Sequence, residues 1–186
     1  MDDLLKQSAK AYSALMPYRY HFTLGHKGRI TPLVIEFPVE AYHHLAGFHK
    51  IGFAQLNNKR KALSAILSGV VTAEQVARAG YCLVDRWQGI CHLQAMLEEN
   101  KAVFRYHGHE RADSNIVADY LLVDVQTIFF VAADHPASIF GQKGQNYERN
   151  CPKLTTLLIE REEVSSGIRT ELYRAKSYID QGKAEE

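Results

Sequence analysis

Two clusters of histidine stand out among the nine histidines of this 186-residue sequence. His43, His44 and His49 lie in one short segment, and His107 and His109 lie in a second. Histidine is the side chain whose ordinary pKa lies closest to neutral pH, so a pair of imidazoles can accept one proton and deliver another. The clusters therefore suggest general acid–base chemistry, with solvated or hydrogen-bonded surface histidines as the alternative.

Basic residues accompany both clusters. Lys50 follows His49 directly, and Arg105 and His107 alternate along an expected strand, so their side chains point to the same face. If that face lies opposite the helix that carries His44, one cleft would hold imidazoles and a guanidinium together. Such a cleft suits a phosphodiester, because Arg or Lys can stabilise the charge that develops on phosphorus. The alternative is a strand whose polar face is simply solvated.

The first cluster is expected on a helix from Pro38 to about Ile51, since proline suits the first helical position. On such a helix His44 and His49 would point about 140° apart. This spacing does not place two imidazoles on one ion, and no nearby cysteine or H-E-x-x-H motif completes a site. We therefore expect neither a metal nor another cofactor. Gly47 in the middle of the helix indicates close approach by another backbone or a ligand, with packing against a strand as the simpler reason.

Two further polar signals are weaker. Lys59, Arg60 and Lys61 form a basic run that could bind an RNA backbone with strong salt dependence, or could be a solvated start of a helix. Ser138 offers a hydroxyl shortly after Pro136, but no acid–base partner stands beside it in the sequence. The absence of G-x-S-x-G, Walker and G-x-G-x-x-G motifs argues against hydrolase-fold esterases, nucleoside triphosphatases and dinucleotide enzymes.

Apolar periodicity predicts the elements that must position these residues. A helix, a hairpin whose Pro32 marks an edge strand, a helical middle third and a run of strands follow one another. The expected helices cover about 2–16, 38–51, 59–67, a short one capped by a Thr72–Gln75 box, and a longer one from Asp85. The expected strands cover 18–24, 29–37, 102–107, 116–123, 127–132 and 153–161, with a polar loop at 135–150 and helix, or strand plus helix, at 164–179. This order predicts an α+β fold with a mainly antiparallel sheet.

Length and composition predict one domain over residues 1–180 and a frayed tail over 181–186. The 46% hydrophobic and 23% charged residues are typical of a soluble globular chain, and no apolar run is long enough to span a membrane. Three scattered cysteines and no signal-peptide pattern indicate a reducing, cytoplasmic compartment. A net charge of +1 excludes a DNA-coating protein, so nucleic-acid contact must depend on a local basic patch.

The segment Tyr42-His43-His44-Leu45-Ala46-Gly47, directly after an expected strand, resembles the phage-encoded nuclease families grouped under the barnase, EndoU, colicin and RelE name. It is closest to the group with an F-x-H-L-x-G signature, although Tyr42 and His43 stand where a phenylalanine and a variable residue usually occur. Pro136-Ala137-Ser138 and the closing antiparallel strand look similar too, so the resemblance spans about 18–179. It implies helices packed on an antiparallel sheet, His44 as the motif histidine, and Ser138 in the site. It also implies metal-independent cleavage in which the 2′-hydroxyl attacks the adjacent phosphorus.

Two functions remain open from the sequence. The first is an endoribonuclease, as a phage or toxin-like effector, with RNA such as transfer RNA as substrate and an antitoxin or immunity protein as partner. Its expected residues are catalytic His44, Lys50, Arg105, His107 and Ser138, and RNA-binding Lys59, Arg60 and Lys61. The second is a non-catalytic module that binds RNA or a protein on the same fold, and a fold alone cannot choose between the two.

Overall fold

An eight-stranded antiparallel sheet and a group of helices form the described part of the computed structural model, residues 3–107, 115–141 and 146–178. The strands follow the order β2-β1-β7-β3-β4-β5-β6, and β8 pairs with β7. Their bounds are β1 (Tyr18–His26), β2 (Arg29–Ile35), β3 (Ala102–Arg105), β4 (Tyr120–Val123), β5 (Thr127–Ala132), β6 (His135–Gly141), β7 (Lys153–Glu163) and β8 (Arg169–Arg174). Every pairing between described strands is antiparallel, which confirms the predicted α+β fold.

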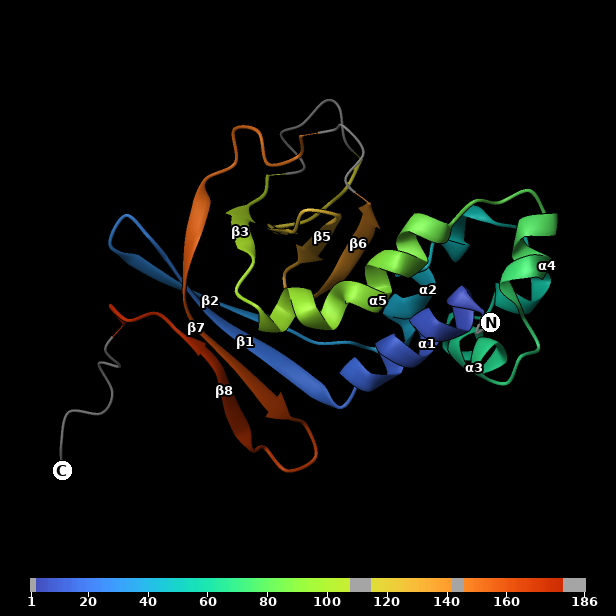
Figure 1. Ribbon diagram of the computed structural model, residues 1–186, viewed down its shortest axis with the longest axis horizontal. Coiled ribbons are helices and arrows are strands. Elements are labelled where there is room, and N and C mark those ends of the chain that lie inside the picture. Colours follow the sequence, from blue (N-terminus) through green and yellow to red (C-terminus); the bar gives the residue numbers. More distant parts are fainter. Residues whose placement is uncertain (1–2, 108–114, 142–145, 179–186) are drawn as a thin grey trace.

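The helices gather at one end of the sheet and on its concave side. They are α1 (Leu4–Leu15), α2 (Val39–Leu45), α3 (Lys59–Leu67), α4 (Ala73–Arg78) and α5 (Val84–Glu98), with short 3-10 turns η1 (Phe48–Lys50) and η2 (Ala54–Leu56). Figure 1 shows the strands on the left and α2, α3 and α4 on the right, with α1 and α5 between them. This arrangement creates a junction between β6, at the edge of the sheet, and the helical part.

Local signals account for the first elements. The Asp3 carboxylate accepts hydrogen bonds from the amides of Leu5 (2.8 Å) and Lys6 (3.4 Å) and so caps α1. The hairpin of β1 and β2 turns over Lys27 and Gly28, both with positive φ, a shorter turn than the four residues predicted. Strand β2 ends the sheet order, as Pro32 predicted.

Side-chain caps begin two helices of the middle third, and the one at α4 was predicted. Asn58 Oδ1 accepts hydrogen bonds from the amides of Arg60 (3.1 Å) and Lys61 (3.2 Å), which begins α3. At α4 the Thr72 hydroxyl accepts from the Gln75 amide at 3.3 Å, and the Gln75 side chain accepts from the Thr72 amide at 2.9 Å. This reciprocal pair is the predicted capping box.

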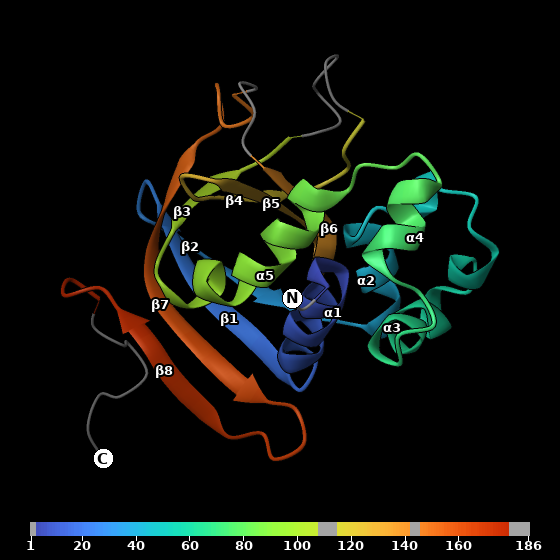
Figure 2. The same ribbon diagram turned by 45° about the vertical axis from the view of Figure 1, so that its right-hand side comes forward.

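Helix α5 lies in the concavity of the curved sheet (Figure 2). Trp87, Ile90 and Leu93 are buried on it, and Gly89 lets the helix approach the sheet closely. A Cβ at Gly89 would lie 3.0 Å from Ile139 of β6. The tight contact fixes the first turn of α5 against the edge strand, which is the turn that carries Asp85 and Arg86.

Two predicted elements are wrong, and a third is right only in part. The helix expected over 38–51 ends at Leu45, because Gly47 has φ +84°, outside the helical region. The expected loop at 135–150 begins as strand β6, which pairs with β5. For the segment 164–179 the predicted alternative of a strand plus a helix is right in its strand: the chain turns at Gly167 (φ +70°) into β8, which pairs with β7, and the residues described there contain no helix. The expected tail at 181–186 lies outside the described residues.

No helix in the part of the chain that the structure describes is long and apolar enough to cross a membrane.

Candidate active site

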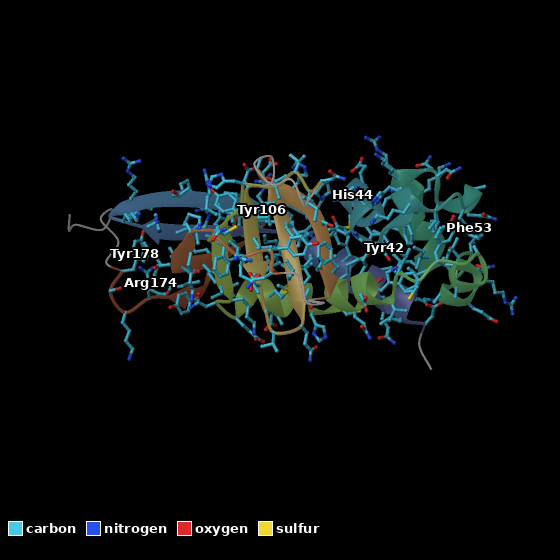
Figure 3. All side chains as sticks on the ribbon, turned by 90° about the horizontal axis from the view of Figure 1, so that it is seen from above. Tyr42, His44, Phe53, Tyr106, Arg174 and Tyr178 are labelled. Atoms are coloured by element: carbon cyan, nitrogen blue, oxygen red, sulfur yellow. The ribbon has the colours of Figure 1, made fainter. Side chains whose placement is uncertain are left out.

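A cleft of about 1170 Å³ opens at the junction between β6 and the helical part. Its volume exceeds the range of roughly 300–1,000 Å³ that is usual for small-molecule sites. One wall comes from α2, η1, α3 and the start of α5, and the other comes from β6 with the segments around 115–117 and 147. Figure 3 places His44 at this junction, where the strands give way to helices.

Two imidazoles are stacked in the cleft. The rings of His44 and His49 lie with their centroids 4.2 Å apart and their planes inclined by 16°. Both side chains line the cleft and are exposed to it. The third histidine of the cluster, His43, is instead buried, with its ring against the edge of Phe48. The cluster therefore supplies two imidazoles to the cleft and one to the core.

Gly47 produces the stack. It follows α2 in the left-handed conformation, and η1 begins directly after it, so the chain reverses between the two histidines. A Cβ on Gly47 would lie 2.9 Å from side-chain carbons of both Leu83 and Arg86. The expectation that His44 and His49 point apart is wrong for this reason. The predicted close approach at Gly47 is made by side chains at the start of α5.

Both stacked imidazoles favour the neutral form. Burial is the first cause that lowers the pKa of His44, and the charges of Arg86 and Lys59 lower it further. For His49, burial and then His44 and Arg86 hold the pKa at about 4. A neutral imidazole has a free lone pair that can accept a proton or a hydrogen bond, and His44, whose pKa is lowered less, is the stronger base of the two.

Arg86 joins the two walls of the cleft. Its Nη1 donates hydrogen bonds to the Leu45 carbonyl at 3.2 Å and to the Ser138 hydroxyl at 3.4 Å. The guanidinium also lies 5.7 Å from the centre of the Phe140 ring. Burial lowers the pKa of Arg86, but an arginine starts so far above neutrality that it stays charged. It is the cation best placed to contact a phosphate beside His44 and Ser138.

The remaining charges leave the cleft positive. Lys50 and Lys59 line it together with Arg86, against two carboxylates, Glu40 and Asp85. The Glu40 carboxylate is already paired with Arg60, whose Nε lies 2.6 Å away. Of the predicted basic run, Lys59 therefore lines the cleft, Arg60 pairs at its rim, and Lys61 is exposed without being among the described lining residues.

The β6 wall contributes Ser138 and a further imidazole. Ser138 is buried at the base of the wall, next to Arg86. His135 begins β6 and lines the cleft, and its Nδ1 lies 3.0 Å from the carboxylate of Asp134. The backbone at Asp134 is held in place, because the Asp134 carbonyl accepts a hydrogen bond from the Glu36 amide at 2.9 Å. A carboxylate on one ring nitrogen orients the imidazole and leaves the other nitrogen for a substrate.

Arg105 and His107 do not share this cleft. Neither is among its described lining residues, so the expectation that they face His44 across one surface is wrong. Arg105 lies on β3, three strand spacings (roughly 14 Å) from β6. Its guanidinium donates a hydrogen bond to the Tyr120 hydroxyl and lies 4.8 Å from the centre of that ring. The expected strand over 102–107 ends at Arg105, so His107 lies beyond β3, and alternation along one strand does not give the position of that strand in the sheet.

Sequence reasoning missed Arg86 and His135. Arg86 had no local signal, because its role depends on the packing of α5 against α2 and β6. His135 could have been found from the apolar residues at 136, 137 and 139, which form a strand beginning at that histidine. In contrast, His44, Lys50, Lys59 and Ser138 were all expected in a site, and the structure brings these four into one cleft.

A search of the described residues finds no group of three or more His, Cys, Asp or Glu side chains placed to hold a metal ion.

Comparison with known proteins agrees with the fold and the motif. A family model described as phage-Barnase-EndoU-ColicinE5/D-RelE like nuclease4 matches residues 4–177 of the 186-residue chain. No curated protein and no solved structure matches the chain. The match covers nearly the whole chain and includes both walls of the cleft, which confirms the resemblance noted in the sequence. The chain belongs to this family of phage-related barnase, EndoU, colicin and RelE-like nucleases.

Proposed function

We propose that the protein is a metal-independent endoribonuclease that cleaves RNA through attack of the ribose 2′-hydroxyl on the adjacent phosphorus. The observation that carries the proposal is the convergence of His44, Arg86 and Ser138 in one positive cleft of a nuclease-family fold. Membership in the family supports a nuclease. The groups in the cleft, which are imidazoles and cations, support chemistry on a phosphodiester without a metal.

His44 is the general base in this proposal. Its lowered pKa keeps the ring neutral near pH 7, so it can accept the proton of the 2′-hydroxyl. His49, with a pKa of about 4, is too weak a base for this step, and it positions His44 by stacking on it. A bound phosphate brings negative charge to the stack, which raises the pKa of both rings and makes His44 a stronger base.

His135 is the general acid. It lies on β6, on the other wall from His44, and its Nδ1 lies 3.0 Å from the Asp134 carboxylate, which orients the ring. In the reaction the O2′–P bond forms as His44 takes its proton, and the P–O5′ bond breaks as His135 delivers a proton to O5′. The products are a 2′,3′-cyclic phosphate and a free 5′-hydroxyl, and solvent restores the two histidines.

Arg86 stabilises the transition state. Negative charge accumulates on the phosphoryl oxygens as the fifth bond forms, and a buried guanidinium stabilises it more strongly than an exposed one. The Ser138 hydroxyl, 3.4 Å from Arg86 Nη1, orients the guanidinium and can donate to the same oxygens. Lys50 and Lys59 contact the flanking phosphates.

A phage or toxin-like effector role follows from the same proposal. Such an enzyme acts on cellular RNA, with transfer RNA as a candidate substrate, in the cytoplasm. It requires an inhibitor such as an antitoxin or immunity protein in the cell that makes it. The open cleft offers that inhibitor a positive surface to block.

The test is cleavage of single-stranded RNA and of transfer RNA in the presence of EDTA, with mass spectrometry of the products. The expected result is fragments ending in a 2′,3′-cyclic phosphate, and no cleavage of the same RNA with every 2′-hydroxyl methylated. Loss of activity on chelation, or cleavage of the methylated strand, contradicts the mechanism. If the protein cleaves none of the RNAs tested, the endoribonuclease proposal is wrong, and a non-catalytic binding module becomes the favoured function.

A further inference from the structure

We propose that the β6 wall of the cleft is a nucleobase-binding surface, so that the substrate is an unpaired RNA nucleotide whose base stacks on Phe140 and Tyr147. The inference rests on the proposed endoribonuclease and adds the substrate class: loops and single strands, not duplexes.

The two walls of the cleft differ in chemistry. The helical wall carries the stacked imidazoles and the cations Lys50, Lys59 and Arg86. The opposite wall is largely apolar, and its apolar lining residues are Ile116, Val117, Pro136, Ala137, Phe140 and Tyr147. Val117 is 77% exposed, so its apolar side chain is open to a ligand in the cleft. A cleft with one cationic and one apolar aromatic wall matches the two faces of a single-stranded nucleotide, its phosphate and its base.

The aromatic rings of this wall are held in fixed orientations. Phe140 and Tyr147 lie with their ring centroids 5.4 Å apart at an angle of 61°. The buried ring of Phe130 supports both from beneath, 5.3 Å from each centroid. Both supported rings are only partly buried. A rigid, half-exposed ring loses little conformational freedom when a base stacks on it, so the surface is preorganised for stacking.

Arg86 lies between the position proposed for the phosphate and the aromatic wall proposed for the base. Its guanidinium touches Ser138, where the scissile phosphate is placed, and lies 5.7 Å from the centre of the Phe140 ring. A phosphate held by Arg86 therefore has the aromatic wall one side chain away, and a nucleotide separates its phosphate from its base by one ribose. The same residue that stabilises the transition state thus brings the base to Phe140 and Tyr147.

Only an unpaired base can use such a wall. In a duplex each base face is covered by its neighbours, and the major groove of A-form RNA is too deep and narrow for side chains to read. A base in a loop can turn its face to the rings at the cost of unstacking alone. An apolar peptide would also cover the wall, but it would bring no anionic group to Lys50, Lys59 and Arg86 opposite. Charge complementarity therefore favours RNA.

The test measures binding and not cleavage. The probe is a single-stranded 2′-O-methyl oligonucleotide, which lacks the attacking hydroxyl, compared with the same strand carrying one abasic site at successive positions. We expect the parent protein to bind the complete strand roughly 5- to 150-fold more tightly than the strand with its abasic site in the cleft. Tyr147→Ala should reduce this ratio toward one, and Tyr147→Phe should preserve it.

A second pair of variants covers the case in which Tyr147→Ala does not fold. Val117 is 77% and Val125 is 86% exposed, so replacement of either by serine removes an apolar side chain without opening the core. Val117→Ser, in the cleft, should lower the ratio, and Val125→Ser, which is not among the described lining residues, should leave it unchanged.

Each result decides between the claims. Equal binding of complete and abasic strands, no binding of the single strand, or equal binding of a duplex overturns the nucleobase surface. Preference for an apolar peptide that displaces the strand overturns it as well. The probe cannot be cleaved, so binding is measured independently of cleavage. If the protein binds in a base-dependent way but cuts no RNA, the proposed nuclease activity is wrong and the nucleobase surface stands. A protein that cuts RNA without base dependence overturns only this inference.

Discussion

The imidazole of His49 stacks on that of His44 at 4.2 Å, although a continuous helix would place the two on different faces. Burial and Arg86 lower the pKa of both rings, and His44 lowers the pKa of His49 further. The stack is therefore a pair of neutral imidazoles, and a bound phosphate would raise their pKa and favour their protonation. Its geometry depends on the reversal of the chain at Gly47.

Gly47→Ala should destabilise the protein and disturb the stack. An alanine at this position would have a positive φ, which costs about 1–2 kcal/mol. Its Cβ would also lie 2.9 Å from side-chain carbons of Leu83 and Arg86. Gly69→Ala is the matched control, since Gly69 has φ +79° but nothing within 4 Å of an added Cβ. Urea denaturation of both variants measures the difference.

We expect Gly47→Ala to lose more free energy of unfolding than Gly69→Ala. We also expect Gly47→Ala to lose RNA cleavage, and Gly69→Ala to keep it. Equal losses of stability in the two variants would show that the contact with Leu83 and Arg86 contributes nothing.

Stability should fall as the pH is lowered from about 6.5 toward 4. An unfolded histidine binds a proton near pH 6.5, whereas folded His49 resists protonation until about pH 4. The unfolded state therefore binds more protons across this window, and the contribution of His49, complete above pH 6.5, is lost as the pH falls. His49→Gln should make the decline shallower between pH 6.5 and 5, as measured by urea denaturation at each pH. Parallel declines in the parent and His49→Gln contradict the lowered pKa.

Lys59 and Lys61 provide a test of the phosphate path. Both begin α3, but only Lys59 lines the cleft. Removing one phosphate contact to a single strand lowers the slope of log affinity against log salt by roughly 0.7. Lys59→Ala should show this change and Lys61→Ala should not, as measured by fluorescence anisotropy with methylated RNA. The reverse order would place the RNA on the outer face of α3.

The elements with local signals were predictable from sequence. The capping box of Thr72 and Gln75 and the edge position of Pro32 both depend on neighbours in the chain, and the structure has them as predicted. The break after Leu45 had a signal, since a glycine in the left-handed conformation commonly ends a helix. That glycine was interpreted as a site of close approach within a helix, so the length of the helix was wrong.

The candidate site was predictable only in part. His44 and Ser138 came from a motif, and Lys50 and Lys59 from their types and positions. Arg86 could not be found, because its contacts to Leu45 and Ser138 join residues 41 and 52 positions away. Arg105 was placed in the site by strand alternation, which fixes a face but not the order of strands in the sheet.

Arg86→Lys should separate charge from geometry. Lysine keeps the positive charge but loses the planar fork that contacts Leu45, Ser138 and a phosphoryl oxygen together. We expect kcat to fall by about 10- to 100-fold with a smaller change in KM, because the lost contacts strengthen in the transition state. Arg78→Lys on α4, outside the cleft, is the control. An increase in KM alone would make Arg86 a binding residue.

The most direct test of the central claim is His44→Ala, with RNA cleavage and RNA affinity measured on the same protein. General acid–base catalysis contributes about 10²–10⁴-fold, so the cleavage rate should fall by this factor while affinity for methylated RNA changes little. His92→Ala, an exposed histidine of α5 outside the described cleft lining, should keep the parent rate, and circular dichroism checks the fold of both. A folded His44→Ala protein that cuts RNA at the parent rate would contradict the account.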